Sequence, residues 1–237
     1  MNTELQNDYE NLQAFWDKVF SMNEEEFREY VAEIDKDNDW RELAPAEKLL
    51  TAIETLKDCN KLLDYGCGTG WGAIAMAKFG ATQIDAVETS KNAVDQAWLW
   101  IKAFEVVSRI NAFKIDNNWL DSVASERYSG ILCSNVLDVI PTEASDAIIK
   151  NFARITAPGA KLIIGMNFYQ EPSADPAKNI EVKEGVHIFY DGILRLVSRT
   201  DEEWADIFSK YFTVEKIDHF AWEGETTERR RIFYLSK

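Results

Sequence analysis

The sequence predicts an α/β protein with a mostly parallel sheet covered by helices, and two observations support this prediction. From Lys61 onward, short apolar or β-branched runs alternate with patterns of helical period, as in βαβ units. The first run ends in "DYGCGTGW", a glycine-rich turn at the position where open α/β sheets bind ligands. Because 237 residues of 46% hydrophobic composition can bury one substantial core, we expect a single domain over residues 1–237.

The first 57 residues predict a helical cap. In "YENLQAFWDKVF", apolar residues recur at three- and four-residue spacings, which is typical of one face of a helix. Asn23 suits the N-cap of a second helix, and Pro45 suits the first turn of a third helix that ends at Leu56. Several aromatic residues of these helices are candidates for a lid over a ligand: Phe15, Trp16, Phe20, Phe27 and Tyr30.

The central segment, residues 58–168, predicts the body of the sheet. Strands are expected at 61–65, 83–88, 111–115, 129–134 and 160–167, and helices near 70–79, 90–107 and 142–155. Ser90 and Thr142 are natural N-caps for the second and third of these helices. Pro158 and Gly159 predict the turn that leads into the fifth strand.

Residues 169–237 predict an excursion followed by the last strands. Residues 170–195 are polar and contain two prolines, so we expect a long excursion over one face. Thr200 and Glu203 form a capping box for a helix. The final strands, "TVEKIDHF" and "RRRIFYLSK", are expected to pair antiparallel at one end of the sheet.

The charge and cysteine content exclude several classes of function. A net charge of −15 disfavours nucleic acid and anionic membranes as partners, because both require clustered Lys and Arg, and favours a small neutral or cationic ligand. The three widely spaced cysteines form no CxxC pair, so neither a disulfide framework nor a metal site is expected. Without a leader-like or membrane-spanning apolar run, a cytoplasmic location is expected.

The glycine loop itself narrows the choice of ligand. Trp71 stands where the dinucleotide fingerprint G-x-G-x-x-G requires its last glycine, and the Gly-Lys-Ser/Thr of a phosphate loop is absent from the sequence. Asp64, at the tip of the first strand, would repel a pyrophosphate and favour an amine or a sulfonium. This contrast favours S-adenosylmethionine.

The stretch "LLDYGCGTG" resembles the first motif of class I S-adenosylmethionine-dependent methyltransferases, and the similarity continues in order over about residues 60–168. The resemblance implies a Rossmann-like three-layer sandwich with a seven-stranded sheet and one antiparallel strand. It implies that Glu88 binds the ribose hydroxyls, that Asp116 and the backbone of Asn117 meet the adenine, and that Ser134 and Asn135 line the methionine end. The remaining expected cofactor contacts belong to the loop and the second strand tip: Asp64, Gly66, Cys67, Gly68, Gly70 and Thr89.

The same residues also have a structural interpretation. Asp64 could bind only the amides of the loop, Glu88 could cap the following helix with Ser90, and Asp116 could start a turn with Asn117. Trp71 could pack against the sheet rather than contact a ligand.

Methyl transfer from a sulfonium is an in-line displacement that depends on positioning, with a base needed only when the acceptor must lose a proton. His219 is the candidate base, in a stretch with Trp222 and Glu223 that a parallel strand would deliver to the ligand edge. His187 and Tyr190 of the excursion are further candidates. The expected substrate contacts are Trp16, Asp138, Asn167, Tyr169 and Trp222.

The sequence thus predicts a methyltransferase that uses S-adenosylmethionine and acts on a small molecule in an enclosed apolar or cationic pocket. A protein or peptide methyltransferase with an open groove, a non-catalytic S-adenosylmethionine-binding module and a nicotinamide oxidoreductase remain alternatives. The sequence leaves the acceptor, the methylated atom and the oligomeric state open.

Overall fold

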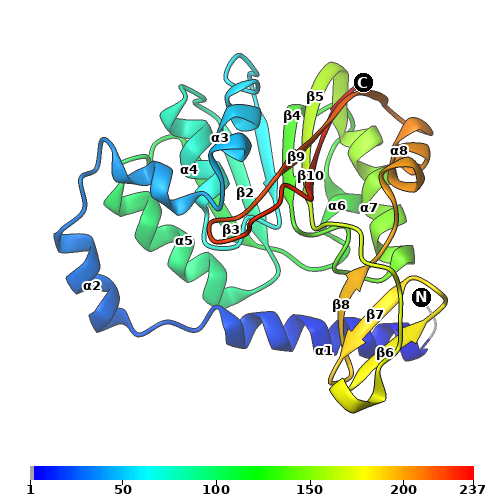
Figure 1. Ribbon diagram of the computed structural model, residues 1–237. Helices are drawn as coiled ribbons and strands as arrows, with labels where there is room; N and C mark the ends of the chain where they lie inside the picture. Colours follow the sequence, from blue (N-terminus) through cyan, green and yellow to red (C-terminus); the bar gives the residue numbers. More distant parts are fainter. Residues whose placement is uncertain (1–2) are drawn as a thin grey trace.

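A seven-stranded sheet between two layers of helices forms the centre of the computed structural model, which describes residues 3–237 and the side chains from Tyr9 onward except Glu24, Glu26 and Tyr30 (Figure 1). The strand order is β3-β2-β1-β4-β5-β10-β9. Strands β1 to β5 pair in parallel, and β10 is antiparallel to both β5 and β9. The bounds are β1 Leu62–Tyr65, β2 Ile84–Glu88, β3 Ile110–Lys114, β4 Tyr128–Ser134, β5 Thr156–Met166, β9 Thr213–Phe220 and β10 Arg230–Ser236.

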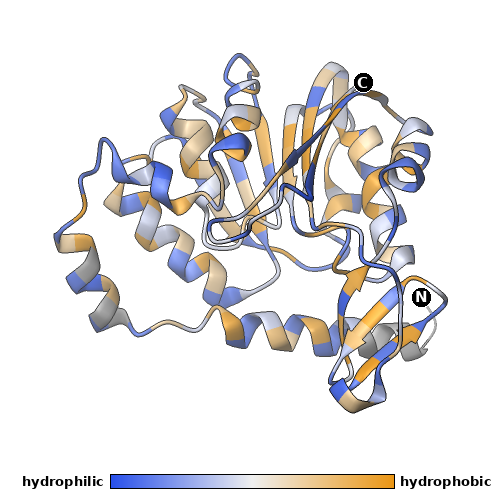
Figure 2. Ribbon diagram, viewed as in Figure 1, coloured by the Kyte–Doolittle hydropathy of each residue, from blue (hydrophilic) through white to orange (hydrophobic). Residues whose placement is uncertain are grey.

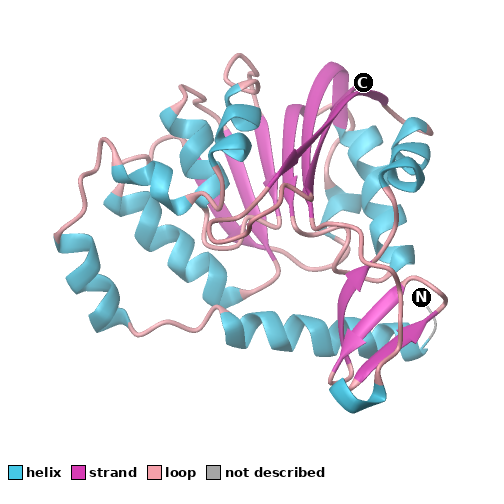
Figure 3. Ribbon diagram, in the orientation of Figure 1, coloured by secondary structure: helices cyan, strands magenta, loops and turns pink. Residues whose placement is uncertain are grey.

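Helices cover both faces of this sheet, as Figure 3 shows. One layer holds α3 (Glu47–Glu54), α4 (Trp71–Lys78) and α5 (Lys91–Ala103); the other holds α6 (Trp119–Ser122), α7 (Thr142–Ile155) and α8 (Asp201–Ser209). The helix α1 (Thr3–Val19) crosses one end of the strands and is followed by α2 (Glu24–Ala32) and the 3₁₀ turn η1 (Asp39–Leu43). The predicted α/β fold with seven strands and one antiparallel strand is confirmed.

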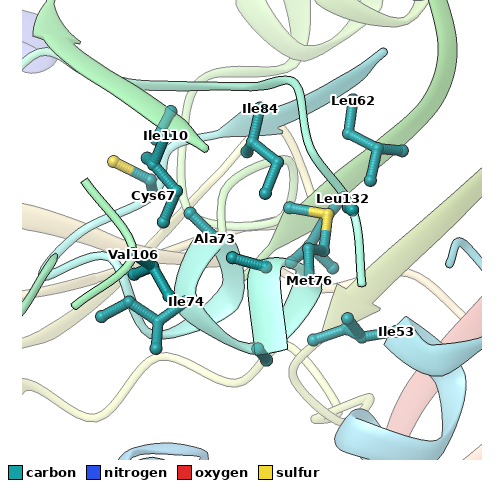
Figure 4. Packing of buried hydrophobic residues seen from close by; sticks show 14 of the residues in the cluster. Ile53, Leu62, Cys67, Ala73, Ile74, Met76, Ile84, Val106, Ile110 and Leu132 are labelled. Carbon is teal, nitrogen blue, oxygen red and sulfur yellow. The ribbon is translucent and has the colours of Figure 1, made fainter. Parts of the chain in front are cut away.

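The apolar core consists of two clusters because alternate side chains of a strand point to opposite faces of the sheet. Leu62 packs on the side of α3, α4 and α5, whereas Leu63 packs on the side of α1 and α7. Figure 4 shows Met76 of α4 near Leu132 and Ile74 of the same helix near Val106 in the first cluster. The central strands β1, β4 and β5 are mostly orange or pale in Figure 2, as expected for parallel strands buried on both faces, whereas the edge strand β9 carries hydrophilic residues.

The excursion after β5 is more regular than the sequence predicted. It forms a separate antiparallel sheet of β6 (Ile180–Lys183), β7 (His187–Tyr190) and β8 (Ile193–Val197), preceded by the 3₁₀ turn η2 (Pro176–Lys178). Its hairpins turn at Glu184-Gly185 and Asp191-Gly192, where all four residues have positive φ between 51° and 74°. The Asp-Gly pair is a hairpin signal that the polar composition obscured. This small sheet lies beside one end of α1, where β8 contacts the helix (Figure 1).

Most predicted helix starts are confirmed. Asn23 accepts a hydrogen bond from the amide of Glu25, Ser90 accepts one from Ala93, and Thr200 and Glu203 form the complete capping box. Among the described helices, none combines the length and the apolar character needed to cross a bilayer.

Three predictions of where an element begins are wrong. Thr142 is the first residue of α7 rather than its cap, because its hydroxyl bonds His187 instead. Pro45 lies two residues before α3, outside its first turn. The strand β5 begins at Thr156, so Pro158 and Gly159 lie within it, where the pairing of β4 with β5 shifts register.

Candidate functional site

The carboxyl ends of β1, β2 and β4 open into a cavity of about 320 Å³, here called the strand-tip cavity. Because α1 crosses these strand ends, the helix forms one wall (Figure 1). The lining residues are Tyr9, Leu12, Gln13, Trp16, Phe20, Pro45, Tyr65, Gly66, Cys67, Gly68, Thr69, Trp71, Val87, Glu88, Thr89, Ile115, Ser134, Asn135, Val136, Val139, Ile140 and Trp222.

The glycine loop brings bare backbone to the floor of this cavity. Gly66 and Gly68 line it, with φ of +70° and +51°, in the left-handed region that glycine adopts without strain. A Cβ on Gly66 would lie 2.3 Å from Cγ2 of Val136, so the loop after β4 also requires glycine here. The amides of Gly66 and Cys67 donate to the carbonyl of Val87, which fixes the loop against β2. Gly70 does not line the cavity; it lies at the start of α4 against Ala97.

Glu88 lies at the tip of β2 and lines the cavity, as predicted from the motif order. Its carboxylate accepts hydrogen bonds from the amide of Gly68 at 3.1 Å and from the amides of Thr89 and Ser90 at 2.6 and 3.1 Å. The hydroxyl of Thr89 donates to the same carboxylate and also faces the cavity. Glu88 therefore orders the loop and presents a negative charge to the cavity at the same time.

Asp64 does not face the ligand side, contrary to the prediction. Its side chain is 3% exposed, lies on the α4 side of β1 and is not part of the cavity lining. The amide of Ala73, in the first turn of α4, donates to it, while Oδ2 has no hydrogen-bond partner. Burial raises the pKa of Asp64 from 3.8 to about 7, with the nearby Glu88 charge adding to the shift. The structural interpretation, in which Asp64 binds backbone amides, describes the observed geometry.

The two residues predicted for the adenine end have different surroundings from Glu88. Asp116 and Asn117 are exposed and lie outside the lining, whereas their neighbour Ile115 lies within it. Asp116 accepts from the amide of Asn118 and so starts a turn, and Asn117 accepts at 2.8 Å from Nε2 of Gln13 in α1. At the opposite end, Ser134 and Asn135 line the cavity as predicted.

The helix α1 is fixed above the strand tips by polar contacts to α5. Asp17 accepts hydrogen bonds from the hydroxyl of Ser90 at 2.6 Å and from the amide of Asn92 at 3.2 Å. Trp16 and Phe20, stacked with ring centroids 6.0 Å apart, line the cavity below it, as the lid prediction required. Phe27 instead packs against Trp100 in the core, and the side chain of Tyr30 lies outside the described residues.

A second cavity, of about 480 Å³, adjoins the first between α1, the small sheet and β10, and is here called the side cavity. Its lining residues are Phe15, Trp16, Val19, Asn135, Val139, Asn167, Phe168, Gln170, Tyr190, Arg195, Leu196, Trp222 and Arg230. Trp16, Asn135, Val139 and Trp222 line both cavities and thus form the junction between them. Three predicted substrate contacts, Trp16, Asn167 and Trp222, therefore line the side cavity, together with Phe15 and Tyr190.

The other predicted substrate contacts lie elsewhere. Asp138 is fully buried, and its carboxylate accepts from the amide of Asn167 at 2.6 Å, so it orders the loop behind the side cavity. Burial raises the pKa of Asp138, and the Arg231 guanidinium opposes that shift. Tyr169 is 38% exposed and bonds Glu171.

The predicted base His219 also lies outside both cavities. Its Nε2 is 2.9 Å from a carboxylate oxygen of Asp201, and together with Tyr169 it lines a separate depression on the α8 side of β9. The other histidine, His187, is 2% exposed and bonds Thr142 at 2.8 Å. Glu223 is exposed and lines neither cavity. Within the described residues, no cluster of three His, Cys, Asp or Glu side chains could hold a metal ion.

Tyr9, Tyr65 and Val139 are lining residues that sequence reasoning missed. Burial raises the pKa of Tyr9 to about 12, and it raises the pKa of Tyr65 and of the lining thiol Cys67 well above their usual ranges. These groups are therefore protonated near pH 7. Their only sequence signal was a place on an apolar face or next to a motif.

The charges of the strand-tip cavity fit a cationic nucleoside that lacks phosphate. Glu88 is the only Asp or Glu among the described lining residues, and none of them is Lys or Arg. A pyrophosphate would find no counter-charge there, whereas a sulfonium or an ammonium group is attracted by the carboxylate. The bare backbone at Gly66 and Gly68 leaves room for close approach of a ligand.

Comparison with known families agrees with this geometry. A family model described as a methyltransferase domain matches residues 38–216. Curated relatives include ribosomal protein L11 methyltransferase of Thermotoga petrophila, 34% identical over 110 residues, covering 46% of this chain and 38% of that protein. Another is glycine N-methyltransferase of Rattus norvegicus, 29% identical over 142 residues, covering 53% of this chain and 47% of that protein. The chain thus spans less than half the length of these relatives.

Solved structures share the fold. The 1,6-didemethyltoxoflavin-N1-methyltransferase of Burkholderia thailandensis, solved with S-adenosylhomocysteine, superposes with a TM-score of 0.63 at 13% identity, covering 97% of this chain and 90% of that one. An S-adenosylmethionine-dependent methyltransferase of Mesorhizobium loti gives a TM-score of 0.59 at 13% identity, covering 82% and 98%.

Proposed function

The chain belongs to the methyltransferase domain family as a class I S-adenosylmethionine-dependent member, and from this premise we propose that it methylates a small molecule held in the side cavity. The observation that carries the proposal is the junction of the two cavities. Trp16, Asn135, Val139 and Trp222 line both, so a donor in one and an acceptor in the other would meet at these residues.

S-adenosylmethionine, the cofactor of the family, supplies a methyl group activated by its bond to a positively charged sulfur. Glu88 would hold the ribose hydroxyls, the backbone at Gly66 and Gly68 would support the amino acid part, and Ser134 and Asn135 would line the methionine end. The negative charge of Glu88 would favour this cationic ligand over a neutral one.

The contribution of the protein to the reaction would be position and exclusion of water. Transfer requires an attacking atom about 3–3.5 Å from the methyl carbon, and holding that geometry removes much of the entropic barrier. The lining thiol and phenols remain protonated near neutral pH, and His219 and His187 lie outside both cavities. We therefore propose an acceptor atom that attacks without a histidine base; where that atom carries a proton, the proton is lost to solvent once the product leaves the cavity.

A small acceptor is favoured over a protein because α1 and the small sheet cover the approach to the junction. A protein acceptor would need an open groove at the same place. The absence of Lys and Arg from the described lining of the strand-tip cavity disfavours a nicotinamide cofactor, whose pyrophosphate needs a counter-charge or free amides. No nucleic-acid or membrane partner is part of the proposal.

The test combines binding and turnover. Calorimetry should show binding of S-adenosylmethionine, weakened by about 1–3 kcal/mol in Glu88→Gln through loss of charge-assisted hydrogen bonds. Glu105→Gln is the matched control, because Glu105 is exposed and pairs with Lys36 away from both cavities. Mass spectrometry should then detect S-adenosylhomocysteine when small amines and phenols are offered as acceptors. Tight binding without turnover on any of them would favour the non-catalytic module, and turnover only on peptides would favour a protein methyltransferase.

A further inference from the structure

The side cavity has a local charge opposite to that of the whole protein. The chain carries a net charge of −15, and this overall charge favours a neutral or cationic ligand. Yet the charged side chains among the described residues that line the side cavity are Arg195 and Arg230, and none is acidic. Net charge describes the average surface, whereas a ligand responds to the groups within a few ångströms.

Arg230 is already neutralised by the fold. Its side chain is buried, and its Nε and Nη2 donate to the carboxylate of Glu225 at 2.7–3.0 Å. Its Nη1 donates to Oδ1 of Asn167 at 2.5 Å, and its guanidinium lies 3.3 Å from the ring centroid of Trp222. Arg230 therefore fixes Trp222 and Asn167 as walls of the cavity and has little charge to offer a ligand.

Arg195, by contrast, has no carboxylate partner within the described part of the chain and is not buried. It is exposed at the rim of the cavity, on β8, and its guanidinium lies over the ring of Phe15 in α1, 4.2 Å from the centroid. Such stacking uses the face of the guanidinium and leaves its N–H groups, which lie in the plane, free to donate. The side chain is thus held in place by an apolar partner that does not cancel its charge.

The geometry points to an acceptor that carries a carboxylate on an apolar or aromatic body, with Arg195 binding the carboxylate. Guanidinium and carboxylate match in a bidentate pair, which gives orientation as well as affinity. The aromatic walls, Trp16, Phe168, Tyr190 and Trp222, suit the body of such a molecule. Anchored at the rim by Arg195, it would direct its opposite end to Asn135 at the junction with the strand-tip cavity. This inference rests on the proposed function, since it assigns the substrate class of that same site.

The test measures binding of simple probes in the presence of saturating S-adenosylhomocysteine. Two matched pairs have nearly the same shape but differ in charge: benzoate with benzamide, and 3-phenylpropanoate with 3-phenylpropanamide. We expect at least one carboxylate to bind at least tenfold more tightly than its amide. Arg195→Gln should abolish that preference, and Arg195→Lys, which keeps the charge without the bidentate geometry, should retain part of it.

Arg229→Gln is the matched control, because Arg229 stacks on the ring of Phe168 but does not line the side cavity. It should keep the preference of the wild-type protein for the carboxylate. Binding of S-adenosylhomocysteine by each variant shows that the fold is intact and separates the two proposals. If S-adenosylhomocysteine binds but amides and carboxylates bind equally, or Arg195→Gln keeps the preference, the carboxylate assignment is overturned while the proposed function stands. If S-adenosylhomocysteine does not bind the wild-type protein, the proposed function itself fails.

Discussion

Replacing Gly66 with alanine tests whether the loop after β1 and the loop after β4 are fitted to each other. Gly66 has a φ of +70°, and an added Cβ would lie 2.3 Å from Cγ2 of Val136. The left-handed backbone costs a residue with a Cβ about 1–2 kcal/mol, and overpacking costs about 1–3 kcal/mol more, so we expect a loss of about 2–5 kcal/mol in the free energy of unfolding.

Two further variants separate these costs. Gly159 has a φ of +77° with nothing within 4 Å of an added Cβ, so Gly159→Ala should show the backbone cost of about 1–2 kcal/mol alone. In Gly66→Ala/Val136→Ala the offending methyl is gone, and the remaining Cβ of residue 136 lies 3.5 Å from the new one, an ordinary contact.

The assay is urea unfolding of all four variants, including Val136→Ala, together with calorimetry of S-adenosylhomocysteine binding. The double-mutant cycle should give a favourable coupling of about 1–3 kcal/mol between positions 66 and 136, as for residues in contact. Gly66→Ala should also weaken ligand binding, whereas Gly159→Ala should not. Equal losses of stability at Gly66 and Gly159, with no coupling to Val136, would refute the reasoning.

Three other outcomes are expected. Burial raises the pKa of Asp64 from 3.8 to about 7, so the stability that its proton contributes is complete below about pH 4 and is lost as the pH rises towards 7. Asp64→Asn should therefore match the wild type in urea unfolding at pH 4 and be more stable than the wild type at pH 8. The same dependence of unfolding free energy on pH in both proteins would contradict this. His219→Gln should leave methyl transfer unchanged and cost less than about 1 kcal/mol, because the pair with Asp201 is partly exposed; a large fall in turnover would restore His219 as the base. Arg230→Met should lower the free energy of unfolding by about 3 kcal/mol, at the low end for a buried ion pair because Glu225 is 31% exposed. An unchanged melting temperature would show that the pair of Arg230 with Glu225 does not stabilise the fold.

The sequence predicted the sheet well because its signals are local. Strands β1 to β5 are apolar runs between turns, and the glycine loop with Glu88 follows from their order. The small sheet was missed because its strands β6 and β8 mix apolar with charged residues and lie within a polar stretch of the sequence. Its hairpin signal at Asp191-Gly192 was the one local clue.

The sequence predicted at which end of the strands the site residues lie, but not towards which side their side chains point. His219 and Asp138 do lie near the carboxyl ends of strands, but which way a side chain points depends on strand register and on loop packing. His219 points to α8 while its neighbour Phe220 packs in the core on the α3 side, and Asp138 points inward to the amide of Asn167. Tyr9 and Arg195 come to the cavities through contacts between segments far apart in the chain, such as α1 with β8, which a single sequence does not encode locally.

The contacts of α1 bear on the departure of reaction products. The helix is attached through side chains, such as Asp17 to Ser90 and Asn92 and Gln13 to Asn117, and it shares no strand pairing with the seven-stranded sheet. Moving it away would break those bonds, the stack of Phe15 on Arg195 and the core contacts of Tyr9 and Leu12, while every β ladder stays intact. Hydrogen exchange along residues 9–20 would report how readily this helix opens to let products leave.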